Sequence, residues 1–203
     1  MIWTLPNALT FTRLIAAVLL PLGYVLLPHP WSDALALVLF TAASLTDFLD
    51  GWLARRWGQV TALGRLLDPI ADKAMVAVAL LVVCGLYGAS WIVLIPAAII
   101  MVREFAVSGL REFLADKQVV MPSSLLAKWK TTVQMTAIAV LLLALYLNFA
   151  GYQTHCILCG RPALGMVDLI GVALLWLSAV MTAITGWQYF ARGLGTIMAE
   201  DAG

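Results

Sequence analysis

Six long apolar stretches dominate this sequence and restrict the folds that are open to it. A transmembrane helix needs about 20 mostly apolar residues, and stretches of that length recur along the whole chain. Because 63% of the residues are hydrophobic and only 11% are charged, against about 45–50% apolar in soluble domains, we predict an all-α integral membrane protein. Its six transmembrane helices are expected at residues 8–27, 33–56, 66–87, 91–115, 124–150 and 165–190.

The basic residues predict how these helices are oriented. No repeat or low-complexity segment divides the 203 residues, so we expect one membrane domain over residues 1–203. Under the expected helices, eleven of the twelve Lys and Arg fall toward one side and only Arg161 falls toward the other. Cytoplasmic loops are rich in Lys and Arg, so both termini are predicted to be cytoplasmic. The formal net charge of +1 makes nucleic acid an unsuitable partner.

Four aspartates stand close together within residues 46–73, namely Asp47, Asp50, Asp68 and Asp72. The charge-free stretches beside them are too short to cross about 30 Å of hydrocarbon unless part of this segment enters the membrane. We therefore place the aspartates at, or slightly within, the cytoplasmic edge of the bilayer. Acidic residues at such a depth are costly and usually functional.

Helical spacing brings these carboxylates together. Asp47 and Asp50 are three residues apart, Asp68 and Asp72 are four apart, and each pair shares one helix face. Carboxylates that converge at low dielectric repel each other unless cations lie among them. All-oxygen ligands suit Mg²⁺ or Mn²⁺, so we predict a site for such a metal and a diphosphate.

Simpler interpretations of single aspartates stay open. Asp68 precedes Pro69 and could serve only as the N-cap of a helix. Asp47 and Asp50 could simply pair with nearby arginines at the membrane interface. The register of all four aspartates with two glycines and an arginine favours the functional interpretation.

The same residues carry a resemblance to a known family. The signature D-x2-D-G-x2-A-R-x8-G-x3-D-x3-D of the CDP-alcohol phosphotransferases is present in full. Its fixed positions are Asp47, Asp50, Gly51, Ala54, Arg55, Gly64, Asp68 and Asp72. Residues 5–13 and 103–135 are similar to the bacterial phosphatidylglycerophosphate synthase branch of this family.

That resemblance implies a homodimeric enzyme of the bacterial inner membrane with its active site toward the cytoplasm. It implies transfer of a phosphatidyl group from CDP-diacylglycerol to sn-glycerol 3-phosphate, with CMP released. Two divalent metal ions held by the four aspartates are implied as well, with Asp72 as the general base. The residues implied to bind CDP-diacylglycerol are Asp50, Gly51, Ala54, Arg55 and Gly64.

An acceptor with a phosphate group needs a basic pocket of its own. Arg103 and Arg111 are two turns apart on nearly one helix face, and Lys128 and Lys130 open the next helix. Because Arg and Lys bind phosphate well, these four are our candidates for binding glycerol 3-phosphate. The lysines could instead only follow the positive-inside bias or touch anionic headgroups. The glutamates that follow the two arginines could orient them or merely pair with them.

Other functions and sites also stay open. A related enzyme could use inositol phosphate, serine or phosphatidylglycerol as acceptor, although a basic pocket favours a phosphorylated one. A divalent-cation transporter would commonly show a repeat and a site near the midplane, and an aspartate-rich prenyltransferase needs more helices. Cys84 is expected in the core. Cys156 and Cys159 with His155 supply too few ligands for a typical zinc site, which leaves a disulfide or two idle thiols.

Overall fold

The chain folds into α-helices, and the residues described by this computed structural model, 5–57, 61–116, 125–151 and 165–201, contain no strand. The description leaves out the side chains of residues 5–6, 48–57, 65, 115–116, 125, 128 and 194–201. The helices are α1 (Leu5–Leu26), α2 (Trp31–Trp57), α3 (Ala62–Leu86), α4 (Trp91–Asp116), α5 (Leu125–Phe149) and α6 (Met166–Asp201). The prediction of an all-α fold is confirmed.

Most of these helices can cross a membrane. Within the described residues, five segments are long and apolar enough, namely Asn7–Leu26, Ala62–Leu86, Trp91–Leu114, Trp129–Phe149 and Met166–Gly193. The remaining helix, α2, is 27 residues long, but many of its side chains lie outside the described part. Such helices are those of a multi-pass membrane protein.

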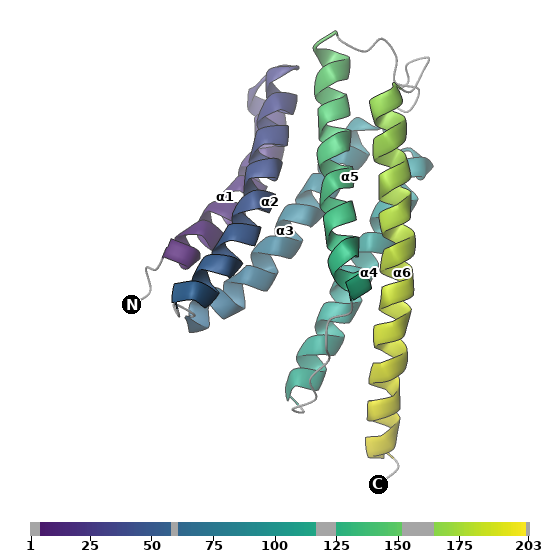
Figure 1. Cartoon of the computed structure of the whole chain (residues 1–203). Coiled ribbons are helices and arrows are strands. Elements are labelled where there is room, and N and C mark those ends of the chain that lie inside the picture. Colours follow the sequence, from purple (N-terminus) through teal and green to yellow (C-terminus); the bar gives the residue numbers. More distant parts are fainter. Residues whose placement is uncertain (1–4, 58–60, 117–124, 152–164, 202–203) are drawn as a thin grey trace.

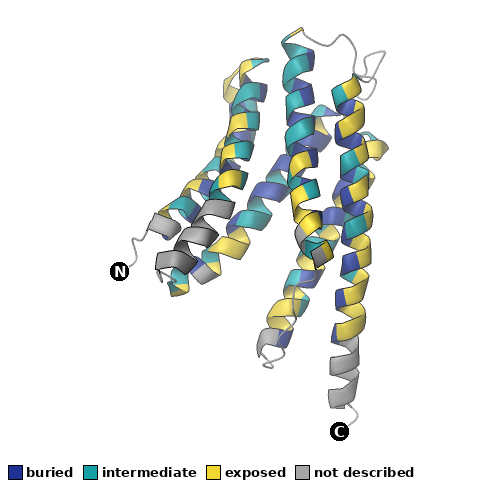
Figure 2. Cartoon of the chain, in the orientation of Figure 1, coloured by how far each residue is buried: buried dark blue, intermediate teal, exposed yellow. Residues whose placement is uncertain are grey.

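The helices pack around an apolar core, but their outer surface is also apolar, unlike that of a soluble protein. Large apolar side chains such as Val25, Leu81 and Val102 are exposed, whereas Arg13 and Lys130 are buried. Figure 2 shows the buried positions along the inward faces of the helices. Lipid can cover apolar side chains, but it cannot satisfy charged ones, which explains why Arg13 and Lys130 lie inside the bundle.

The helices form two groups of three. In the first, α1 packs against both α2 and α3; in the second, α6 packs against both α4 and α5. Contacts of α2 with α5 and of α3 with α4 and α5 join the groups. In Figure 1, α1 begins and α6 ends at the same end of the bundle. This agrees with an even number of crossings, while the cytoplasmic location of that end stays a prediction.

Two helix boundaries differ by four residues or more from the sequence-based prediction. The helix α3 begins at Ala62, where the Thr61 hydroxyl accepts a hydrogen bond from the backbone N–H of Gly64 at 3.0 Å. Asp68 and Pro69 therefore lie inside α3, and the interpretation of Asp68 as an N-cap was wrong. The helix α6 continues to Asp201, beyond residue 190, because a helix that leaves the membrane does not need apolar residues to continue.

A buried aspartate ties three helices together at the end of the bundle where α6 begins. The Oδ1 atom of Asp168 accepts a hydrogen bond from the Tyr87 hydroxyl at 2.6 Å, and its Oδ2 accepts one from Asn148 Nδ2 at 3.2 Å. The backbone N–H of Gly165 donates to Oδ2 as well, at 3.1 Å. These bonds satisfy a buried carboxylate, so Asp168 has a structural role. Cys84, which stands just before Tyr87 in the sequence, is buried and belongs to the hydrophobic core, as predicted.

The close approach of α5 and α6 depends on Gly171. A Cβ atom at this position would lie 2.7 Å from Leu141 Cδ2 and 3.3 Å from the backbone nitrogen of Leu141. We predict that Gly171→Ala lowers the free energy of unfolding by about 1–3 kcal/mol, the usual cost of overpacking. Thermal unfolding in detergent measures the change.

Gly109 provides the matched control, because a Cβ atom there meets nothing within 4 Å. Gly109→Ala should leave stability unchanged or raise it by about 0.5–1 kcal/mol, since Ala favours a helix over Gly. Equal melting temperatures for the two variants would contradict the proposed packing of α5 on α6.

Candidate active site

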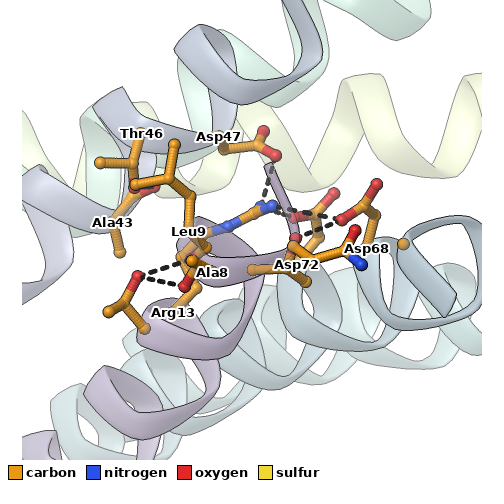
Figure 3. Close-up of polar contacts among 12 residues, drawn as sticks. Ala8, Leu9, Arg13, Ala43, Thr46, Asp47, Asp68 and Asp72 are labelled. Atoms are coloured by element: carbon orange, nitrogen blue, oxygen red, sulfur yellow. Dashed lines mark hydrogen bonds and ion pairs between the residues drawn. The ribbon is translucent and has the colours of Figure 1, made fainter. Parts of the chain in front are cut away.

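Three acidic side chains converge on one arginine where α1, α2 and α3 meet. Asp47 comes from α2, Asp68 and Asp72 come from α3, and Arg13 reaches between them from α1, as Figure 3 shows. The Nη1 group of Arg13 donates to Oδ1 of both Asp47 and Asp72. Its Nη2 atom lies 3.8 Å from Oδ1 of Asp68. A single guanidinium therefore pairs with carboxylates from two helices, and because it carries one positive charge it offsets only part of theirs.

The cation and the acids differ sharply in exposure. The side chain of Arg13 is 3% exposed, whereas those of Asp47, Asp72 and Asp68 are 40%, 41% and 52% exposed. Arg13 thus lies on the covered side of the cluster. The carboxylates keep an open side from which a ligand can approach.

Two further residues of α1 reach the same region. The Thr10 hydroxyl donates to Oδ1 of Asp68 at 2.5 Å. Asn7 is buried, and its Oδ1 accepts a hydrogen bond from the Thr61 hydroxyl at 2.9 Å. A Cβ atom at Gly64 would lie 2.7 Å from Asn7 Oδ1, so the absence of a side chain at Gly64 lets α1 approach α3.

A second charged cluster joins α4, α5 and α6. The buried Lys130 donates to Glu104, and Arg103 Nη1 lies 3.5 Å from the same carboxylate oxygen, Oε1. Arg103 also donates through Nη2 to the Thr185 hydroxyl at 3.1 Å. Glu104 therefore pairs with a lysine and an arginine at once, one of the two roles expected for it.

Tyr189 of α6 holds the two arginines of α4 near each other. Its ring centroid lies 5.7 Å from the guanidinium carbon of Arg103 and 5.2 Å from that of Arg111. Arg111 Nη2 donates to the Tyr189 hydroxyl at 3.3 Å. Cation–π contacts of this kind hold guanidinium groups in place. The result is a group of three basic side chains from α4 and α5, Arg103, Arg111 and Lys130.

Comparisons with known proteins decide the family. The model of the CDP-alcohol phosphatidyltransferase family matches residues 3–184. This chain belongs to that family. A relative from Cereibacter sphaeroides, a CDP-diacylglycerol–glycerol-3-phosphate 3-phosphatidyltransferase, is 41% identical over 98% of this chain and 99% of its own.

Relatives with the same name occur in other bacteria. The one from Rickettsia bellii is 41% identical over 92% of this chain and 93% of its own. The one from Salmonella typhimurium is 37% identical over 98% of this chain and 99% of its own. The resemblance identified from the signature residues is thus confirmed along nearly the full length.

The structure describes only part of the predicted site. It brings Asp47, Asp68 and Asp72 together, and it places Arg103, Arg111 and Lys130 in one cluster. The side chains outside the described part are those of Asp50, Gly51, Ala54, Arg55 and Lys128. The roles assigned to these residues stay predictions, as do those of Cys156 and Cys159, which lie in the undescribed segment 152–164.

Several residues of these clusters were not predicted from the sequence. Asn7, Thr10 and Arg13 recur every three residues and share one helix face, a signal that marks a polar face but not its partner. Tyr189 lies in α6, for which the sequence analysis predicted a transmembrane helix and no site residue.

The donor set of the first cluster suits a hard divalent cation. Among the described residues, no group of three or more His, Cys, Asp or Glu is arranged to hold a metal ion. Asp47 and Asp72 nevertheless direct one oxygen each at the same guanidinium nitrogen. Two of the four predicted ligands therefore meet around one cationic group, and carboxylate oxygens are what Mg²⁺ and Mn²⁺ prefer.

Glu104 should be essential for stability, because it is the partner of the buried Lys130. We predict that Glu104→Ala lowers the free energy of unfolding by about 3 kcal/mol, since a buried charge then lacks its partner. Glu112→Ala is the control, because Glu112 is exposed on the same helix; its effect should stay within about 0.5 kcal/mol. Similar melting temperatures for both variants in detergent would contradict the pairing.

Proposed function

We propose that this chain transfers the phosphatidyl group of CDP-diacylglycerol to sn-glycerol 3-phosphate, which gives phosphatidylglycerophosphate and CMP. The reaction is an early step toward phosphatidylglycerol and cardiolipin. The shared name of the full-length relatives supports it. One structural observation supports assigning this reaction to specific residues. Three aspartates of the family signature, Asp47, Asp68 and Asp72, lie together in one half-exposed cluster.

The proposed enzyme binds its donor at the membrane edge. Its multi-pass helices keep the lipid tails of CDP-diacylglycerol in the bilayer, while the diphosphate reaches the aspartates from their open side. Asp50, Gly51, Ala54, Arg55 and Gly64 bind the nucleotide part, by resemblance to the family. The excess of basic residues on one side supports a bacterial inner-membrane enzyme with a cytoplasmic active site. A homodimer is proposed on the resemblance alone.

The four aspartates of the signature, Asp47, Asp50, Asp68 and Asp72, are the proposed ligands of two divalent ions, Mg²⁺ or Mn²⁺. When bound, these ions neutralise the diphosphate and the departing CMP. Asp72 accepts the proton of the acceptor's 1-hydroxyl. The oxygen of that hydroxyl bonds to the β-phosphorus, and the bond from this phosphorus to the bridging oxygen breaks. CMP leaves with the electron pair of that bond.

The acceptor pocket is assigned to the second charged cluster. Arg103, Arg111 and Lys130, with Lys128 by proximity in sequence, supply positive charge for the phosphate of glycerol 3-phosphate. Glu104 and Tyr189 keep the basic groups in place through the contacts described above. Lys73 Nζ donates to Ser108 of α4, and this contact links the helix of Asp72 to the helix of the arginines.

The reaction itself is tested with purified protein in detergent, CDP-diacylglycerol and one acceptor at a time. With Mg²⁺ or Mn²⁺ present, CMP and phosphatidylglycerophosphate should form with sn-glycerol 3-phosphate and not with serine or inositol phosphate. Mass spectrometry identifies the lipid, and removal of the metal with EDTA should stop CMP release. Another phospholipid would overturn the acceptor assignment, and no CMP from folded protein would overturn the enzyme assignment.

Asp72→Asn tests the general base. The amide cannot accept the proton, so we predict that kcat falls by roughly 10²–10⁴-fold, the usual contribution of a positioned base. Turnover is measured as CMP release at saturating metal and both substrates. Near-normal turnover of this variant would show that the base lies elsewhere.

Arg111→Ala tests the acceptor pocket. Loss of a charge-assisted hydrogen bond to phosphate costs about 1.5–3 kcal/mol, so the KM for glycerol 3-phosphate should rise by roughly 10- to 100-fold. The KM for CDP-diacylglycerol should stay unchanged, which makes the donor an internal control. An unchanged KM for glycerol 3-phosphate would remove Arg111 from the pocket.

A further inference from the structure

One face of α1 carries three buried polar side chains at intervals of three residues. They are Asn7, Thr10 and Arg13, and none is more than 3% exposed. Polar groups are costly to bury in a membrane helix unless they are paired. Their partners therefore indicate what this face is for.

Each of the three residues contacts a different part of the family signature. Asn7 fills the space beside Gly64, Thr10 donates to Asp68, and Arg13 donates to Asp47 and Asp72. The signature residues lie on α2 and α3. The polar face of α1, formed by Asn7, Thr10 and Arg13, packs against them and completes the site from a third helix.

Within this polar face of α1, Arg13 lowers the repulsion between two of the acids. Asp47 and Asp72 come from different helices, and like charges that close at low dielectric repel each other. Arg13 Nη1 donates to one oxygen of each and so offsets that repulsion. Because Arg13 is covered while both carboxylates are about two-fifths exposed, it holds them from behind and leaves their open side accessible.

Thr10 holds the third acid, Asp68, through a hydrogen bond. Asp68 is the most exposed of the three, and the hydroxyl of Thr10 fixes one of its oxygens at 2.5 Å. Partners behind the ligands of a metal site set the orientation of those ligands.

We propose that Thr10 and Arg13, with Asn7 beside Gly64, are positioning residues that prearrange Asp47, Asp68 and Asp72 for a divalent cation. This inference rests on the proposed function, because it concerns the same site. The residues need not touch the substrates. Their loss lowers metal affinity and turnover, while the acceptor pocket on α4, α5 and α6 is unaffected.

The test is a titration of the full-length protein in detergent with Mn²⁺, in which electron paramagnetic resonance reports free Mn²⁺. Arg13→Gln should weaken Mn²⁺ binding by roughly 10- to 100-fold, the usual effect of removing a partner behind a metal ligand. Arg13→Lys, which keeps the charge but is shorter and lacks the second guanidinium nitrogen that lies near Asp68, should recover part of the loss. In turnover assays kcat should fall, with the KM for glycerol 3-phosphate unchanged.

A milder pair of variants decides the question if Arg13→Gln does not fold. Thr10→Val preserves shape and should weaken Mn²⁺ binding by about fivefold, the equivalent of one ordinary hydrogen bond. Thr12→Val is its control, because Thr12 is exposed on the same helix and its side chain bonds to backbone carbonyls of its own helix. Thr12→Val should bind Mn²⁺ like the wild type.

Opposite results would overturn the proposal in distinct ways. Equal or tighter Mn²⁺ binding by Arg13→Gln would mean that Arg13 only competes with the cation for the carboxylates. Equal Mn²⁺ binding by Thr10→Val and Thr12→Val would show that Thr10 is not a positioning residue. A rise in the KM for glycerol 3-phosphate in Arg13→Gln would indicate general disruption. If the wild type binds no Mn²⁺ and releases no CMP, the proposed function fails, and this inference fails with it.

Discussion

The ion pairs of Arg13 with Asp47 and Asp72 hold α1, α2 and α3 together at one point, and the candidate active site depends on them. In a bundle of apolar helices, two carboxylates from neighbouring helices would repel each other strongly without a nearby cation. A buried guanidinium without its acids would be equally unfavourable, since breaking such a pair costs about 3–5 kcal/mol. Arg13 of α1 and the aspartates of α2 and α3 therefore depend on one another as ion-pair partners.

The second group of helices follows the same rule with other residues. Glu104 pairs with Lys130 and Arg103, and the ring of Tyr189 lies within cation–π distance of both Arg103 and Arg111. Each group thus has a polar centre. Apolar contacts such as those of α2 with α5 join the two groups, together with the hydrogen bonds of Tyr87 to Asp168 and of Lys73 to Ser108. The proposed reaction uses this division, with the donor's diphosphate at the acidic centre and the acceptor's phosphate at the basic one.

The sequence predicted features that are set by local spacing. Apolar length predicted the helices, and the intervals between Asp47, Asp50, Asp68 and Asp72 predicted which acids share a face. It could not predict that Arg13 would meet those acids, because the spacing within one helix does not reveal which helix lies opposite. Tyr189 was missed for the same reason. The start of α3 was missed because the cap depends on Thr61, which lies outside the apolar run.

A structure of the protein with Mn²⁺ and CDP, in which anomalous scattering locates the metal, would test this account most directly. We expect Mn²⁺ on the open side of Asp47 and Asp72, with Arg13 still bound to both carboxylates from the covered side. Mn²⁺ located away from these aspartates would contradict the assignment of the site. Mn²⁺ between them with Arg13 displaced would contradict its positioning role.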